Sequence, residues 1–337
     1  MRVLTFGLAF GLAVGLGAVG SVFLFCPHRA LASAPAPASA SAPASASASA
    51  SAPVPGGCIA APHACGFPDA TNTGVPAGMI LRAVPGQVSS GRGWSYDRAA
   101  GEVDVTGNDA VLSGLSIRGN LNIAASNVTI KDDEVTAAGY FGVSLRHTTD
   151  VMIEHSTIRG QNLTTGRVGS AIDDVYGDST GMVIKDDNIS CFKTAVQVTT
   201  GLVAGNYIHG FGYLAGDHTN GILDIGTAQP LMIYDNTILN TRGQTDAISL
   251  DASATGETVA NKTVQDNLLA GGSFTIYGGA ARRSTTSNIV IEDNRFSQAY
   301  YAKGGQYGPV AYFSSRGNGD TWSGNTWIGT GQAIRTP

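Results

Sequence analysis

One pattern of apolar and polar residues recurs along the chain between residues 130 and 327. It consists of an apolar residue, any residue, a residue that is usually Asp or Gly, then Asn or Asp, any residue and a second apolar residue. Residues 184–189 (Ile-Lys-Asp-Asp-Asn-Ile) are an example. Neighbouring copies are 19 to 31 residues apart, so the chain repeats one structural unit. The shared polar position falls on Asp133, Ser156, Asp187, Asn206, Asn236, Asn267, Asn294 and Asn325.

Each unit also holds a second short segment in which apolar and polar residues alternate. A period of two residues is typical of a half-buried strand, and no part of the repeat region sustains the 3.6-residue period of a helix. Strands that recur about every 20–30 residues without crossover helices predict an all-β chain folded as a parallel β-solenoid of about eight to nine coils. A β-propeller needs about 40 residues per blade and a β-sandwich needs hairpin turns, so neither fits. The second segments are residues 142–145, 171–173, 195–198, 221–223, 247–250, 275–277 and 310–313.

Stacked coils place equivalent residues in columns. The recurring Asn or Asp position therefore predicts a polar ladder at one corner, where these side chains bond backbone groups of the turns. We expect the ladder to be structural, because it recurs in nearly every coil. Lys131, Glu154 and Lys185 are predicted to stack as outward residues of alternating charge.

The repeat, with its Ile-x-x-Asp-Asn-x-Ile units, resembles the right-handed parallel β-helix proteins of the pectate-lyase-like superfamily. Residues 65–78 (Cys-Gly-Phe-Pro-Asp-Ala-Thr-Asn-Thr-Gly-Val-Pro-Ala-Gly) resemble the opening of a group of exported actinobacterial β-helix proteins. The resemblance extends from about residue 66 to residue 331 and implies a right-handed, single-stranded parallel β-helix. It does not choose a reaction, because that superfamily contains lyases, hydrolases, esterases, tailspikes and adhesins.

Residues 1–34 are predicted to be an export signal. Arg2 begins it, an apolar run follows to residue 26, and residues 32–34 (Ala-Ser-Ala) fit a cleavage site. The run is long enough to span a bilayer, so an uncleaved signal anchor is the alternative, with membrane contact confined to this segment. Residues 35–56, nearly all Ala, Ser and Pro, predict a linker, which leaves 57–337 for the β-helix domain. We expect a secreted protein, or one held at the cell surface or cell wall.

The charge content and the cysteines limit the partners and the metal sites that we expect. Charged residues make up 13% of the chain and the net charge is −5, which argues against a nucleic-acid partner. In an exported protein, Cys58 and Cys65 are predicted to form a disulfide. The alternative is a metal site that includes His63, for which no fourth ligand is evident.

Long connections lie between the first and second strands of several units, at residues 159–170, 209–220, 239–246 and 297–309. Stacking places these loops side by side. Flat aromatic faces stack on sugars and polar groups bind hydroxyls, so the loops predict a groove for an extracellular polysaccharide. The alternative is that the tyrosines of these loops pack on their own coils and bind no sugar. The proposed binding residues are Tyr213, Arg242, Tyr300, Tyr301, Lys303 and Tyr307.

The catalytic candidates are Asp217, His218 and Asp246. Proteins that resemble this one often have His-x-Asp-Gly-Ile here, whereas this chain has Asn220 at the acidic position. Asp246 occupies the same column one coil later, and a carboxylate beside an imidazole can orient it as a general base. The chain is therefore predicted to be a polysaccharide lyase or glycoside hydrolase, or alternatively a non-catalytic glycan-binding adhesion protein.

Asp173 and Asp174 form an adjacent acidic pair in a predicted strand. Two neighbouring carboxylates repel, so one pKa rises or a cation lies between them. Calcium is the candidate cofactor, because it prefers oxygen ligands. Solvated surface acids are the alternative, and the sequence indicates no other cofactor.

Overall fold

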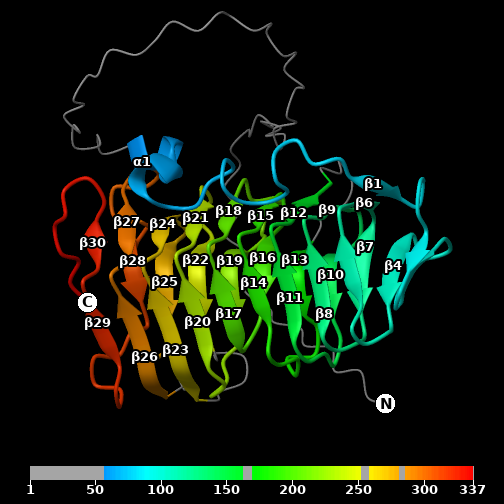
Figure 1. Ribbon diagram of the computed structural model, residues 1–337. Helices are drawn as coiled ribbons and strands as arrows, with labels where there is room; N and C mark the ends of the chain where they lie inside the picture. Colours follow the sequence, from blue (N-terminus) through cyan, green and yellow to red (C-terminus); the bar gives the residue numbers. More distant parts are fainter. Residues whose placement is uncertain (1–56, 162–168, 252–257, 281–284, 337) are drawn as a thin grey trace, which may run out of the picture.

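The computed structural model describes residues 57–336 except 162–168, 252–257 and 281–284. The strands stack along one elongated body in three long sheets of 10, 11 and 9 strands (Figure 1). Residues 1–34 and 35–56, predicted as signal and linker, lie outside the described residues. In the part that is described, no helix is long and apolar enough to cross a membrane.

We call the three sheets A, B and C. Sheet A contains β1 (Arg82–Val84), β6 (Leu115–Arg118), β9 (Glu134–Ala137), β12 (Thr157–Gly160), β15 (Asn188–Ser190), β18 (Tyr207–His209), β21 (Thr237–Asn240), β24 (Leu268–Gly271), β27 (Arg295–Ser297) and β30 (Thr326–Trp327). Sheet B contains β2 (Ser90–Gly91), β3 (Trp94–Asp97), β4 (Glu102–Val105), β7 (Asn120–Ile123), β10 (Phe141–Leu145), β13 (Ser170–Asp174), β16 (Thr194–Gln197), β19 (Thr219–Asp224), β22 (Thr245–Leu250), β25 (Phe274–Gly278) and β28 (Gly308–Ala311). Sheet C contains β5 (Val111–Ser113), β8 (Val128–Lys131), β11 (Val151–Glu154), β14 (Val183–Lys185), β17 (Gly201–Ala204), β20 (Leu231–Tyr234), β23 (Val259–Gln265), β26 (Thr286–Glu292) and β29 (Thr321–Ser323).

From β4 onward the chain visits sheets B, C and A in turn, and each strand pairs in parallel with the equivalent strand of the next coil. Among the described residues, β4 to β30 form nine such triplets. The predicted parallel β-solenoid is therefore confirmed. The pattern indicated two strands per unit, whereas the structure has three, because the recurring hexapeptide bends sharply between sheets C and A.

That bend explains the composition of the repeat. Asp132, Asp186, Asp235, Asp266 and Asp293 precede the ladder position and have φ between 51° and 57°. Asp tolerates this left-handed conformation better than most residues with a side chain. The turn can then place the next residue inward, where the ladder forms.

The core is built from columns of apolar residues, one from each coil. In sheet B the inward column runs through Ile172, Val196, Ile222, Ile248 and Ile276, all of them buried. Each coil buries its apolar residues against the coils on either side, so the core is continuous along the body.

The polar ladder lies inside the corner between sheets C and A, as predicted. The Asn236 carboxamide oxygen accepts the Asn206 main-chain N–H at 3.0 Å, and Asn267 does the same for Asn236 at 2.9 Å. The Asn236 amide nitrogen donates to Val203 O at 2.9 Å and to Tyr234 O at 3.0 Å. These bonds link neighbouring coils and satisfy buried backbone groups.

The predicted charge column is also present. Glu154 lies between two lysines, 2.9 Å from Lys131 Nζ and 2.8 Å from Lys185 Nζ. The hydrogen bond from Lys185 is the main reason that the pKa of Glu154 is lowered.

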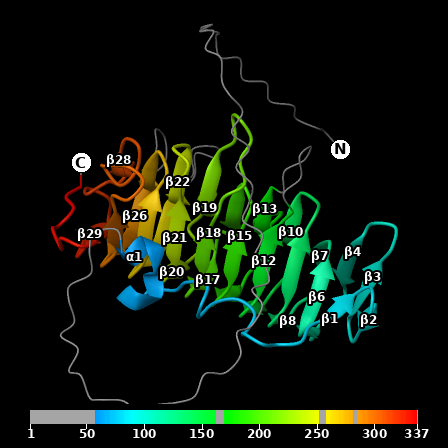
Figure 2. The ribbon, with the colours of Figure 1, turned by 90° about the horizontal axis from the view of Figure 1, so that it is seen from above.

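The described chain begins with α1 (Gly57–Ala60) and η1 (Pro62–Cys65), beside the later strands of sheet A, and then runs along the outside of that sheet towards β1 (Figure 2). The Gly74 N–H donates to Asp186 O at 2.8 Å, and the Val75 N–H donates to Thr157 Oγ1 at 3.1 Å. Residues 66–81 thus form a strap that crosses several coils.

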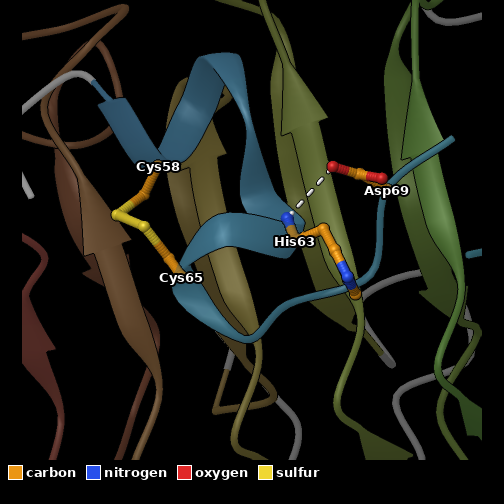
Figure 3. Close-up of a disulfide and its surroundings, with 4 residues drawn as sticks. All are labelled: Cys58, His63, Cys65 and Asp69. Carbon is orange, nitrogen blue, oxygen red and sulfur yellow. Dashed lines mark hydrogen bonds between the residues drawn. A yellow bond between two sulfur atoms is a disulfide. The ribbon is translucent and has the colours of Figure 1, made fainter. Parts of the chain in front are cut away.

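The strap is preceded by the predicted Cys58–Cys65 disulfide, which is confirmed (Figure 3). Because the two sulfur atoms are bonded to each other, the alternative metal site is excluded. His63 uses its main-chain N–H to bond Asp69 Oδ2 at 3.0 Å, which fixes the turn into the strap.

The two ends of the core are covered in different ways. At the first coil, β3 pairs antiparallel with β2 on one side and with β4 on the other, and Trp94 is buried there. At the last coil, the segment after β30 turns back so that Ile334 joins the core, and Trp322 Nε1–H donates to Ile334 O at 2.8 Å. Both devices shield apolar residues that an open coil would expose.

Candidate functional site

The long loops connect sheet A to sheet B, so they border the outer face of sheet B. Along that face runs the column that follows the inward isoleucines, and alternation turns its side chains away from the core. It carries Ser144, Asp173, Gln197, Leu223, Ser249 and Tyr277 on successive strands. Unlike the ladder, this column changes residue type at each coil.

The loops before β19, β22 and β28 meet beside sheet B. The Arg242 guanidinium lies over the Tyr213 ring, 5.0 Å from its centroid, in a cation–π contact. The Tyr301 hydroxyl donates to Thr241 O at 3.1 Å. Among the described residues, the buried Arg242 Nε has no hydrogen-bond partner. The structure thus brings together three of the six predicted binding residues.

The other three predicted binding residues are separate from that group. Tyr300 is half-buried against Gly271, the last residue of β24, and burial raises the pKa of its hydroxyl. Lys303 is exposed. Tyr307 is exposed, with its ring centroid 5.9 Å from that of Phe274.

Asp217, His218 and Asp246 have different surroundings. The Asp217 carboxylate accepts the Leu214 N–H at 2.9 Å and so closes a turn. His218 is exposed, and its Nε2 is 3.3 Å from Gln244 Nε2. Asp246 is 1% exposed, on β22. The catalytic role of these residues stays a prediction, but only Asp246 has the environment of a proton donor.

Asp246 is held within a polar cluster. With its amide nitrogen directed towards β22, Asn220 donates to Thr245 Oγ1 at 3.1 Å and to the two Asp246 carboxyl oxygens at 3.2 and 3.3 Å. Burial raises the pKa of Asp246 well above its usual range, and the nearby negative charge of Asp251 raises it further, against a hydrogen bond with Ser249. These surroundings favour the neutral, proton-bearing form of the Asp246 carboxyl over the carboxylate.

Four aromatic side chains form a cluster on the next strands, which we call the aromatic cluster. Phe274 and Tyr277 come from β25, and Tyr307 and Tyr312 flank β28. The Tyr277 centroid is 5.7 Å from that of Phe274 and 5.5 Å from that of Tyr312, with Tyr312 stacked at 25°. The Tyr277 hydroxyl is 2.9 Å from Ser273 Oγ.

The aromatic cluster lies beside Asp246, because β22 and β25 are neighbouring strands, about 4.8 Å apart. The Asp246 charge contributes to the raised pKa of Tyr277, of which burial is the main cause. Of these aromatic residues, sequence reasoning identified only Tyr307. Tyr277 could have been found from the alternation in residues 275–277. Because Ile276 points inward, this alternation predicts that Tyr277 points outward.

Asp173 and Asp174 have separate partners. Asp173 is on the outer face, where it accepts a bond from Gln197 Nε2 at 3.2 Å, and burial raises its pKa to about 6. Asp174 occupies the next position, where its carboxylate accepts the Ser179 N–H at 3.2 and 3.3 Å. The described residues contain no group of three or more His, Cys, Asp or Glu side chains placed to hold a metal ion. Calcium at this pair stays a prediction.

Comparisons with known proteins identify no family. No protein-family model matches the chain, and no curated protein matches it. Among solved structures, the chain is similar to the Dettilon tailspike protein, with 14% sequence identity and a TM-score of 0.46. The match covers 65% of this chain and 45% of the tailspike chain, so this chain spans less than half of that protein's length.

Proposed function

We propose that the outer face of sheet B binds an extracellular polysaccharide. The observation that carries this proposal is the aromatic cluster beside the buried Asp246 carboxyl. Aromatic rings stack on the apolar faces of sugar rings, and nearby hydroxyl, amide and carboxyl groups bond sugar hydroxyls. Tyr307 and Tyr312 are 60% and 48% exposed, so their rings are accessible.

The loop group formed by Tyr213, Arg242 and Tyr301 extends this surface along one border of sheet B. Successive strands are about 4.8 Å apart, so a polymer that crosses several coils meets a different side chain at each one. The outer column of sheet B changes residue type from coil to coil, so each sugar unit of a bound polysaccharide would have its own contacts. The disulfide supports a secreted or cell-surface location, because such bonds persist in oxidising environments.

Binding is tested with the purified protein and a panel of neutral and acidic polysaccharides, by affinity electrophoresis and calorimetry. We expect Tyr307→Ala to weaken binding about three- to tenfold, the loss of one stacking contact. Tyr234→Ala is the matched control, because this tyrosine is 38% exposed on sheet C. Equal losses in both variants, or no binding by the wild type to any glycan, would contradict the proposal.

A second candidate function is cleavage of the bound glycan, favoured by the position of Asp246 beside the aromatic cluster and by the burial that raises its pKa. A protonated carboxyl donates its proton to the oxygen of a glycosidic bond as that bond breaks. The Asp251 carboxylate, near enough to raise the pKa of Asp246, is the candidate partner that activates water or stabilises the sugar cation. This pairing favours a hydrolase over a lyase, which needs a base to remove a proton.

Cleavage is tested by measuring new reducing ends, with absorbance of unsaturated products as the readout for a lyase. We expect Asp246→Asn to lower the rate roughly 10²–10⁴-fold while binding is retained. Asp235→Asn is the control, because burial also raises the pKa of Asp235, whereas this residue lies between β20 and β21, at the corner of sheets C and A. If the wild type binds the glycan but forms neither product, cleavage is contradicted and the protein is a non-catalytic glycan-binding adhesion protein.

A further inference from the structure

The core contains a lysine and an aspartate that no surface function uses. Lys262 in β23 and Asp224 at the end of β19 are each 0% exposed. Lys262 occupies an inward column between Leu231 and Ile289 on the neighbouring strands, and Asp224 is paired with Leu250. Both polar side chains thus occupy positions that neighbouring coils fill with apolar residues.

The two groups lie against each other. Lys262 Nζ is 3.2 Å from Asp224 Oδ2, and it donates to Thr199 O and to Gln229 O, each at 2.8 Å. Thr227 Oγ1 is the other polar neighbour, at 3.3 Å. A neutral amine has two N–H bonds and one lone pair. In the ammonium form, the third N–H donates to Thr227 Oγ1. When the amine is neutral and its two N–H bonds stay on the carbonyl oxygens, this position holds the lone pair, on the side of Asp224.

The two oxygens of the Asp224 carboxyl group have different neighbours. Asp224 Oδ1 accepts the Gly226 N–H at 3.2 Å, which stabilises negative charge on that oxygen. Asp224 Oδ2 is the oxygen on the side of the amine. Burial disfavours both charged forms: it raises the pKa of Asp224 to about 6 and lowers the pKa of Lys262. Each shift increases the share of the neutral amine or the neutral carboxylic acid.

We propose that Lys262 Nζ and Asp224 Cγ condense to an isopeptide bond that joins two neighbouring coils. The nitrogen lone pair attacks Cγ, and Oδ1 takes the developing negative charge beside the Gly226 N–H. The nitrogen then transfers one proton to the hydroxyl at Oδ2 of the carboxylic acid. The bond from Cγ to Oδ2 breaks, Oδ2 leaves as water with both protons, and the double bond from Cγ to Oδ1 re-forms. One N–C bond forms, one C–O bond breaks and one water is released, so no oxidant or cofactor is required.

Three conditions favour this step over a permanent ion pair. The fold holds Lys262 Nζ 3.2 Å from Asp224 Oδ2, the oxygen bonded to Cγ, and such proximity accelerates bond formation greatly. The site excludes water, which would hydrolyse the product. Finally, a buried ion pair gains little over apolar side chains of similar volume, because removing both charges from water costs several kcal/mol. An amide removes both charges.

Peptide mapping of the purified wild-type protein tests the bond directly. After reduction and trypsin digestion, we expect residues 194–242 joined to residues 243–282 in one branched peptide, uncleaved at Lys262. Its mass should equal the sum of the two linear peptides minus one water, and fragmentation should place the branch at Asp224 and Lys262. Recovery of residues 194–242 and 243–262 as separate linear peptides would overturn the proposal.

Two variants test the mechanism. Lys262→Arg retains a cation but has no nucleophilic amine, so residues 194–242 should be recovered as a linear peptide from protein whose circular dichroism shows it to be folded. Asp224→Asn should give a branched peptide of the same mass as the wild type, because ammonia leaves in place of water. A branched peptide in Lys262→Arg would show that the bond joins other residues and would overturn the assignment.

Discussion

Two regions of this protein bury polar side chains, and they do so in opposite ways. In the ladder, the same residue type recurs from Asn206 to Asn325, and each amide bonds the backbone of a neighbouring coil. On the outer face of sheet B, the residue changes at each coil, and the bonds run between side chains such as Asn220 and Asp246.

This contrast separates structure from function. Backbone groups recur in every coil, so a side chain that satisfies them must recur as well. A ligand has no such period, and the side chains that bind it need not repeat. A column that departs from the repeat is therefore where a site is expected in a solenoid.

The ladder should be the more sensitive region to truncation. Asn236→Ala removes the acceptor for the Asn206 N–H and the donor for Val203 O and Tyr234 O. Because these groups are buried, we expect a loss of about 3 kcal/mol in the free energy of unfolding. Urea denaturation measures it. A loss below about 1 kcal/mol would mean that the ladder bonds add little, and the contrast with sheet B would fail.

Two coils of the ladder carry Asp in place of Asn, and they should behave in the opposite way. Asp133 Oδ1 accepts the Leu115 N–H at 2.7 Å, but Oδ2 is buried without a hydrogen-bond partner in the described structure. In the equivalent place, the Asn206 amide nitrogen donates to Ile184 O. Burial raises the pKa of Asp133 to about 7. We expect Asp133→Asn to stabilise the protein by about 2 kcal/mol at pH 8.

The sign of the pH dependence follows from that shift. The folded state holds the Asp133 proton up to pH about 7, whereas the unfolded chain releases it near the ordinary value of 3.8. Its stabilising contribution is therefore complete below 3.8 and is lost as the pH rises through 7. The gain in Asp133→Asn should shrink towards pH 4, as followed by thermal unfolding. The reverse change, Asn206→Asp, should cost stability at pH 8 and little at pH 4; equal effects at both pH values would contradict the assignment.

The same contrast explains what could be predicted from the sequence. The ladder, the strands of sheet B and the charge column around Glu154 were all predicted, because they recur and a recurring pattern is visible in one sequence. The third strand of each coil was not predicted, since the corner between sheets C and A divides a hexapeptide that reads as one strand.

The site was harder to predict because its residues do not recur. His218 and Asp246 were paired from their spacing, yet the coil path gives them different neighbours, Gln244 and Asn220. Tyr277 and Tyr312 come from different coils and meet only through the stacking of β25 on β28. The pKa of Asp246 depends on burial by surrounding segments, which no local pattern records.

The smallest effect on stability is expected on the outer face of sheet B, at Gln197. Its amide nitrogen donates to Asp173 Oδ1 at 3.2 Å, and its neighbour in the next coil is Leu223, which offers no hydrogen bond. Gln197 is half-buried, so water replaces the lost bond in Gln197→Ala, and we expect the free energy of unfolding to change by less than about 1 kcal/mol. Urea denaturation beside Asn236→Ala gives the comparison on one scale. A loss as large as that of Asn236→Ala would show that this column is a second structural ladder, and the case for a binding face along it would be lost.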